Sequence, residues 1–258
     1  MLGSDSVRVR STVGFLTVLG LICGTLAFAQ APPQGQAQGQ GRGGRGGGGG
    51  GAQRAATAAL VMKVEWVRPA SQTGQTAVVQ ENIGGTDLEM KQYGAGKQVL
   101  TSGNPGSATA PFGVWTGECA GPFAITFRDK SNYLNLTGLS KVSWITKTSG
   151  FHVVRPVVKL ADGTMLVGEH SEYHVPMLTR TEFSLSGMRW IKLDPDRVVT
   201  LNAGALSGGG ANEIWFLNPD LSKVDEFGFA DLMPASGHGT GGYVHLAGIE
   251  VYGAPVPR

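Results

Sequence analysis

Apolar and polar residues alternate with a period of two along most of the chain after residue 59. In the stretch 141–147, Val142 and Trp144 share one face, and the residues between and around them are polar or outward-facing. Near the end of the chain, Ile249 and Val251 alternate with polar neighbours in the same way. This pattern is typical of half-buried β-strands, and no stretch holds a convincing amphipathic helix. We therefore predict an all-β fold.

Turn residues separate these stretches at short intervals. The stretch 151–160 is followed by Ala161-Asp162-Gly163, which predicts a hairpin onto residues 165–167. Pro156 lies in the middle of that stretch and indicates an edge or bulged position, because proline donates no backbone hydrogen bond. About ten short strands with irregular loops favour two packed antiparallel sheets over a barrel.

The first 54 residues have a different character. Arg8 and Arg10 precede an apolar stretch, 13–28, which ends in Ala27-Phe28-Ala29, the small-x-small pattern of a signal peptidase site. Residues 30–54 are rich in Gly, Gln and Arg and nearly lack apolar side chains, so burial cannot offset their backbone entropy. We predict a signal peptide over 1–29, a disordered linker over 30–54 and one β-sandwich domain over 55–258, exported to the periplasm or the cell exterior.

Composition narrows the range of partners. The net charge of +2 comes from arginines before residue 52, because acidic and basic residues nearly balance after it. A nucleic-acid partner is therefore not expected. After residue 30 no apolar run approaches the roughly 18 residues of a membrane span. Once the signal peptide is removed only Cys119 remains, so no disulfide within the chain is expected, and we place this thiol in the core, where it is inert.

Several segments carry a resemblance to a known fold. The stretch 136–144 (LTGLSKVSW), then Lys159-Leu160-Ala161-Asp162-Gly163, Phe227-Gly228-Phe229 and the closing Ile249-Glu250-Val251-Tyr252-Gly253 resemble the strand order of galactose-binding-like jelly rolls. This is the fold of many bacterial carbohydrate-binding modules and of discoidin domains, and the resemblance covers residues 85–253. The segment 225–234 (DEFGFADLMP) also resembles one in exported bacterial proteins. The resemblance implies a ligand at loops on one end of the sandwich or on a concave sheet face, and it supplies no catalytic residue.

Glycine-rich loops offer places for such a ligand. Sugar recognition needs an aromatic face for the C–H side of a pyranose and planar polar groups for its hydroxyls. Our predicted ligand site combines His238, Tyr243, Asn212 and Trp215, with Asn104 nearby in a further loop. Glycines surround His238 and leave it open to a ligand. The three loops concerned are 102–110, 202–212 and 234–242, and plain connectors are the alternative interpretation.

A second candidate cluster comprises His170, Tyr173 and His174. In a strand, residues four apart lie about 13 Å apart, so the two histidines could share a metal ion only if the chain turned there. No third ligand is marked, so we assign no zinc ion to this pair, and no cofactor is expected. Jelly rolls of this kind often hold a structural calcium near the chain ends; Asp87, Glu89 and Glu250 are conceivable donors, but nothing in the sequence fixes their geometry, and no metal is assigned. His152 shares a face with Val154 and is interpreted as a hydrogen-bonded histidine at the sheet margin.

The tryptophans could be stacking platforms or core residues. Trp144 alternates in phase with Val142, and Trp190 lies in an apolar segment, so both are assigned to the core. Trp115 follows a Pro-Phe-Gly entry and is assigned to the core as well.

Three functions remain open on these observations. We favour a non-catalytic exported carbohydrate-binding or surface-adhesion module with a glycan partner. The alternatives are a structural or protein-interaction domain of the cell envelope and a sugar-active hydrolase or lyase on the same scaffold, although no nucleophile elbow, phosphate loop or HExxH helix occurs.

Overall fold

The computed structural model describes residues 58–117, 119–201, 215, 218–232 and 242–258. The predicted signal peptide, the whole predicted linker, and His238 and Asn212 lie outside these residues. The described residues form antiparallel strands joined by turns and two short 3-10 segments, η1 (Gln80–Asn82) and η2 (Ala95–Gln98). None of the helices among them is long and apolar enough to cross a membrane.

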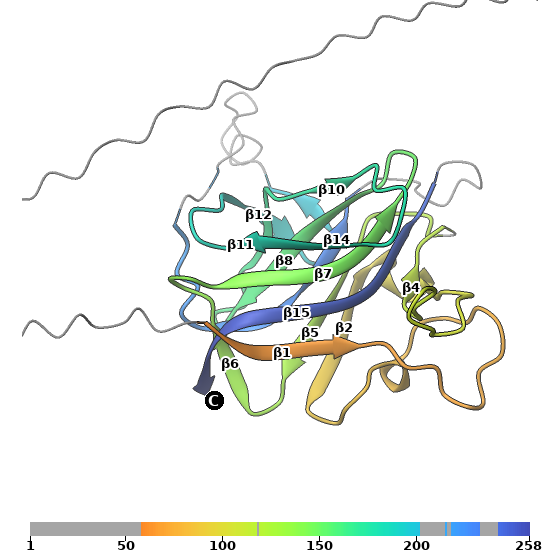
Figure 1. The fold of residues 1–258 in the computed structure, drawn as a ribbon. Coiled ribbons are helices and arrows are strands. Elements are labelled where there is room, and N and C mark those ends of the chain that lie inside the picture. The colour runs from red at the N-terminus through yellow and green to blue at the C-terminus, as the bar shows by residue number, and fades with distance from the viewer. Residues whose placement is uncertain (1–57, 118, 202–214, 216–217, 233–241) are drawn as a thin grey trace, which may run out of the picture. The chain divides into compact units, whose positions relative to one another are not determined.

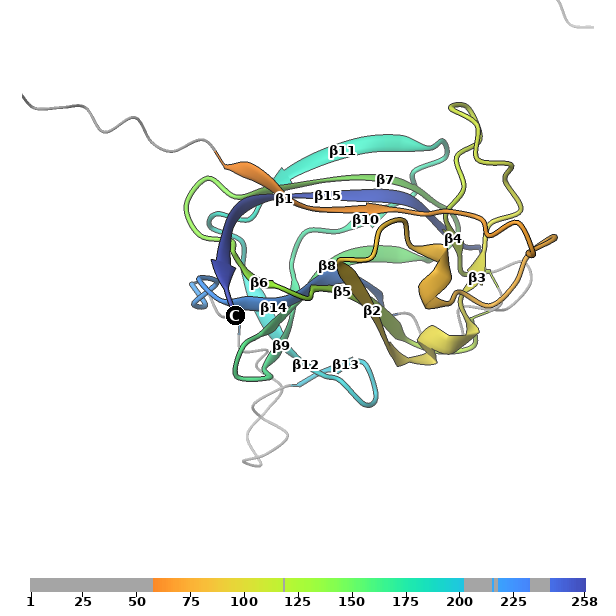
Figure 2. The ribbon, with the colours of Figure 1, turned by 90° about the horizontal axis from the view of Figure 1, so that it is seen from below.

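The strands form two layers that pack face to face (Figure 2). Sheet 1 has the order β11 (Thr179–Ser184), β7 (Lys141–Thr148), β15 (Val244–Pro257) and β1 (Ala59–Glu65), and β4 (Val114–Trp115) and β3 (Leu100–Thr101) continue it beside the start of β15. Sheet 2 has the order β2 (Leu88–Gly94), β5 (Phe123–Asp129), β14 (Val224–Asp231), β8 (Val153–Leu160), β9 (Met165–Gly168), β12 (Trp190–Asp194) and β13 (Val199–Thr200), and β10 (Glu172–Tyr173) pairs with one end of β8.

The last strand belongs to both layers. From Val244 to Tyr252, β15 pairs with β7 in sheet 1, and from Ala254 to Pro257 it pairs with β6 (Asn132–Asn135), which also contacts β14 of sheet 2. Figure 1 shows β15 running along β7 and β1 toward the C-terminus beside β6. The all-β antiparallel jelly-roll sandwich predicted from the sequence is confirmed.

The core between the layers is built from alternate residues of facing strands. Trp144 of β7, Phe227 and Phe229 of β14, and Trp190 of β12 are fully buried, so the assignment of Trp144 and Trp190 to the core is confirmed. Each fully buried aromatic side chain of this size contributes several kcal/mol to the free energy of unfolding. A hydrogen bond joins Nδ1 of His152 and Oδ2 of Asp231, which are 2.6 Å apart, and both side chains are almost fully buried. The interpretation of His152 as a hydrogen-bonded histidine is confirmed.

The hairpin at 161–163 is confirmed, with Gly163 at φ 88° and the Thr164 amide bonded to Asp162 Oδ1. The interpretation of Pro156 as an edge or bulged residue needs correction, because β8 is an interior strand. On one side β8 pairs with β14 from Val154 to Leu160. On the other side, β10 pairs with Val153 and Val154, and β9 pairs only from Val157 onward. The proline lies in the gap between these two partners, where no ladder bond to β9 or β10 is required.

Candidate functional site

A row of outward-facing side chains crosses sheet 1 near one end. Lys147 on β7 lies opposite His245 on β15, and His245 lies opposite Trp115 on β4. Opposed residues of antiparallel strands point to the same face. The neighbours Val114, Val244 and Leu246 are fully buried in the core, so Lys147, His245 and Trp115 must face away from it.

This row forms the floor of a cavity of about 560 Å³, which we call the sheet 1 cavity. Its walls come from the loop after β3, from the segment between β10 and β11, and from Tyr243, two residues before His245 on the same strand path. The further lining residues are Gln75, Ser102, Gly103, Asn104, Thr109, Ala110, Pro176, Met177 and Leu178. The cavity thus combines aromatic, amide, hydroxyl, imidazole and ammonium groups.

Two aromatic rings form one side of the sheet 1 cavity. The ring centroids of Trp115 and Tyr243 are 6.1 Å apart, with an angle of 41° between the planes. The indole lies over Gly117, where a Cβ atom would be only 2.1 Å from Cζ2 of Trp115. The backbone of Tyr243 is fixed by reciprocal hydrogen bonds with Ser149. Local packing therefore holds both rings at the cavity wall.

His245 is the most buried polar group of the floor. Its side chain is 5% exposed, and Nε2 has no hydrogen-bond partner among the described residues. Burial, followed by the positive charge of Lys147, lowers the pKa of His245 from 6.5 to about 4. The imidazole is therefore neutral at pH 7. A buried polar nitrogen without a partner costs free energy, and a ligand that bonded to it would recover that cost.

The loop that closes the cavity on one side is anchored to the sandwich. Nη2 of Arg68 donates hydrogen bonds to the carbonyl oxygens of Ser102, at 3.1 Å, and Asn104, at 2.9 Å. The guanidinium also lies 4.8 Å from the centroid of the Phe112 ring. These contacts fix a loop whose glycines could not hold one conformation alone, so this wall of the cavity is formed before a ligand arrives.

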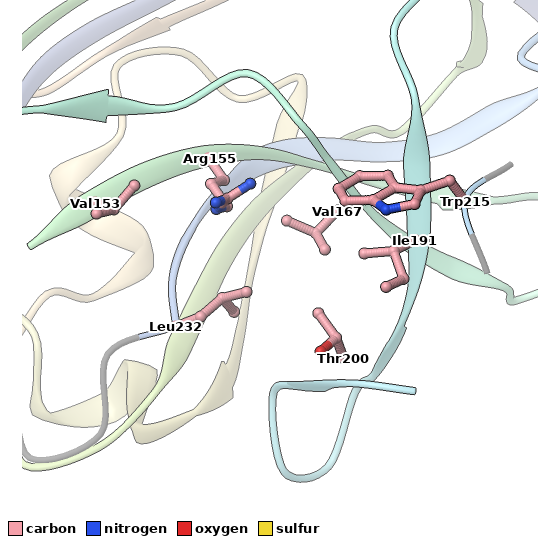
Figure 3. Close-up of a pocket in the computed structure, with 7 residues that line it drawn as sticks. All are labelled: Val153, Arg155, Val167, Ile191, Thr200, Trp215 and Leu232. Atoms are coloured by element: carbon pink, nitrogen blue, oxygen red, sulfur yellow. The ribbon is translucent and has the colours of Figure 1, made fainter. Parts of the chain in front are cut away.

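The structure separates two of the predicted site residues. Tyr243 lines the sheet 1 cavity, whereas Trp215 lines a smaller cavity of about 280 Å³ on the outer face of sheet 2 (Figure 3). There Trp215 lies near Ile191 and Val167, and Arg155 projects toward the same space. The guanidinium of Arg189 lies 4.8 Å from the centroid of the Trp215 ring. The two aromatic residues consequently belong to different surfaces.

The second predicted cluster is tied to the core. His170 stacks on Phe183, with centroids 3.8 Å apart, and Nε2 lies 3.0 Å from Glu172 Oε1. The same carboxylate oxygen accepts a hydrogen bond from Trp144 Nε1 at 3.3 Å, and the bond with His170 lowers the pKa of Glu172. Tyr173, by contrast, is 68% exposed. In the described part of the chain, no group of three histidine, cysteine or acidic side chains could hold a metal ion.

Trp115 requires a correction, because it is partly exposed on the outer face rather than buried in the core. The sequence interpretation also missed Lys147 and His245 as site residues. The sequence did contain a local signal that Trp115 and His245 face outward, because their neighbours are apolar and buried. Val114 precedes Trp115, and Val244 and Leu246 flank His245. Alternation alone could have assigned these side chains to the outer face, but it could not have joined three strands from distant parts of the sequence.

No protein-family model and no curated protein matches the chain. Among solved structures, the chain is similar to the family 11 carbohydrate-binding module from Clostridium thermocellum in complex with a β-1,3-1,4-mixed-linked tetrasaccharide. That module is 16% identical over 73% of this chain and 100% of the module, with a TM-score of 0.39. PfGH50B and an exo-β-agarase are each 9% identical, with TM-scores of 0.35, over 66% and 72% of this chain. The chain spans 23% and 25% of the lengths of these two proteins.

Proposed function

We propose that this chain is an exported, non-catalytic carbohydrate-binding module whose glycan occupies the sheet 1 cavity. The observation that carries the proposal is the meeting of Trp115, Tyr243 and the unpartnered Nε2 of His245 at one cavity. A pyranose has an apolar C–H face and a rim of hydroxyl groups. Aromatic rings accommodate the first, and a few placed polar groups fix the second.

A binding role fits the chemistry of the cavity wall better than hydrolysis does. Glycosidases act through two facing carboxyl groups. The described lining of the sheet 1 cavity instead offers an imidazole that is neutral at pH 7, an ammonium group and side-chain amides. These groups hold hydroxyls and ring oxygens in place, which is the task of a module rather than of an enzyme.

Export is part of the same proposal. The signal sequence over 1–29 would deliver the chain across a membrane, and the Gly-rich linker over 30–54 would let the domain reach a polysaccharide at a distance. N-terminal sequencing of the protein isolated from its natural host tests this part directly. A mature chain that begins at Gln30 is the expected result, and a retained Met1 contradicts it.

Binding is tested with a glycan array followed by calorimetry on the best ligand. Replacement of Trp115 or Tyr243 by Ala should weaken binding by tenfold or more, about 1.4 kcal/mol, with the melting temperature nearly unchanged. Trp215→Ala is the matched control, because it removes an aromatic ring from the cavity on sheet 2. If Trp215→Ala alone weakened binding, the glycan site would lie on sheet 2. If the array gave no ligand, the carbohydrate-binding function itself would fail.

A further inference from the structure

Among the residues that the structure describes, the charged side chains on the outer face of sheet 1 are paired, with one exception at the cavity. Away from it, Lys63 pairs with Glu65, Lys141 pairs with Glu182 over 2.9 Å, and Arg180 pairs with Glu250 over 3.3 Å. Lys147 lies on the same face, at the position opposite His245. Within the described residues its ammonium group forms no ion pair, and Nζ lies over the ring of Tyr243, 5.5 Å from the ring centroid.

The described lining of the sheet 1 cavity includes no carboxylate, so Lys147 gives it a net positive charge. The second cavity on the outer face of sheet 1 is lined by Lys63 and Arg180 together with Glu65 and Glu250, which balance each other. The loop after β3 contributes to both cavities, with Asn104 in one and Gly106 in the other. Of these two cavities on sheet 1, only the one that contains the two aromatic rings therefore has an unbalanced positive charge.

His245 adds a second, independent indication of a ligand. Residues at opposed positions of antiparallel strands have Cβ atoms about 4.5–5.5 Å apart, so Lys147 and His245 stand side by side on the cavity floor. Nε2 of His245 is buried and has no partner among the described residues. A single group of a ligand, placed between the two side chains, could accept a hydrogen bond from the ammonium group of Lys147 and also form a hydrogen bond with the imidazole of His245.

We propose that the sheet 1 cavity selects a glycan that carries an anionic substituent, a carboxylate or a sulfate, and that Lys147 is its charge partner. The inference rests on the proposed carbohydrate-binding function and specifies its ligand class. The sugar ring packs against Trp115 and Tyr243, and its anionic group lies over Lys147 beside His245. A neutral sugar would leave the ammonium without a counter-charge, whereas a cationic amino sugar would be repelled.

The direct test compares polymers that share a backbone and differ in charge. Polygalacturonate is compared with its fully methyl-esterified form, and dextran sulfate with dextran, by affinity electrophoresis and calorimetry on the mature protein. At least tenfold tighter binding of the charged member is expected in one pair or both, and the pair that shows it distinguishes carboxylate from sulfate. The preference should decrease as salt rises from 0.01 M to 1 M, because the Debye length falls from about 30 Å to about 3 Å.

Variants of single lysines test whether the preference for the charged polymer arises at the sheet 1 cavity. Lys147→Gln should reduce the preference for the charged polymer at least tenfold, and Lys147→Arg should retain most of it. Lys223→Gln is the matched control, because it removes the same charge from an exposed position just before β14, and it should change nothing. Melting temperatures of all variants are measured in parallel, so that the comparison is made only between folded proteins.

Three outcomes separate the two proposals. If a glycan bound through Trp115 but charged and neutral forms bound equally, the anionic selection would be overturned and the binding module would stand. If Lys223→Gln weakened binding as much as Lys147→Gln, or if single-stranded DNA bound as tightly as the charged glycans, general attraction of polyanions would replace a selective site. If the glycan array gave only neutral ligands and none of these polymers bound, the anionic selection alone would be overturned. If neither the polymers nor the array gave a ligand, the proposed function itself would be overturned.

Discussion

His245 on β15 lies directly opposite Lys147 on β7, with its imidazole buried and its pKa lowered to about 4. In the unfolded chain the same imidazole has a pKa near 6.5. Between pH 4 and pH 6.5 the unfolded state therefore binds more protons than the folded state, and the free energy of unfolding falls as the pH drops. The expected loss approaches about 3 kcal/mol near pH 4.

The contribution of His245 is measured as a difference, because carboxylates titrate in the same range. Chemical unfolding of the wild type and of His245→Gln is compared from pH 7.5 to pH 4. The stability of the wild type relative to the variant should decline below pH 6.5. A constant difference across this range would show that the imidazole is not held neutral by burial.

Trp144 is a second target, since its indole is fully buried between the sheets. Trp144→Ala should lower the free energy of unfolding by about 3–5 kcal/mol, the range for removal of a large buried aromatic side chain. The change also removes the hydrogen bond to Glu172. Trp115→Ala serves as the comparison and should cost less, because that ring is partly exposed. Equal losses in denaturant melts of both variants would contradict the placement of Trp144 in the core.

Gly228 on β14 lies against its neighbour β5 so closely that no side chain fits. An added Cβ would be 2.0 Å from the carbonyl oxygen of Ile125 and 2.6 Å from Cα of Thr126, both backbone atoms that cannot rotate away. Gly228→Ala should destabilise the domain by several kcal/mol or prevent folding. At Gly103 the nearest atom would be 3.9 Å away, so Gly103→Ala should be nearly neutral in the same thermal melt.

Cys119 should be unreactive in the folded protein. Its side chain is fully buried, its Sγ lies 3.4 Å from the carbonyl oxygen of Gly121, and burial raises the pKa of the thiol. Since the thiolate is the reactive form, labelling by a thiol-specific reagent at pH 8 should be slow and should accelerate on addition of denaturant. Rapid labelling under native conditions would be evidence against this burial.

Local sequence determined some of the strand faces and turns of this protein. Alternation over 141–147 placed Trp144 in the core, and Ala161-Asp162-Gly163 specified its hairpin, because strand faces and tight turns depend on neighbouring residues. The local pattern failed where both faces of a strand are covered. In β8, Val158 packs between the sheets and Val157 packs on the outer side of sheet 2, so alternation could not show how Pro156 fits an interior strand.

The candidate site was decided by the tertiary structure. Tyr243 was found from the sequence because its own loop composition indicated it, and Trp215, chosen on the same grounds, lies at a different cavity. Lys147, Trp115 and His245 come from separate strands, and nothing near each of them in the sequence specifies the others. Their alignment in one row follows from the register of β7, β15 and β4. That register is set by which faces the core buries across the whole sheet, since a shift by one residue would exchange every inward and outward side chain.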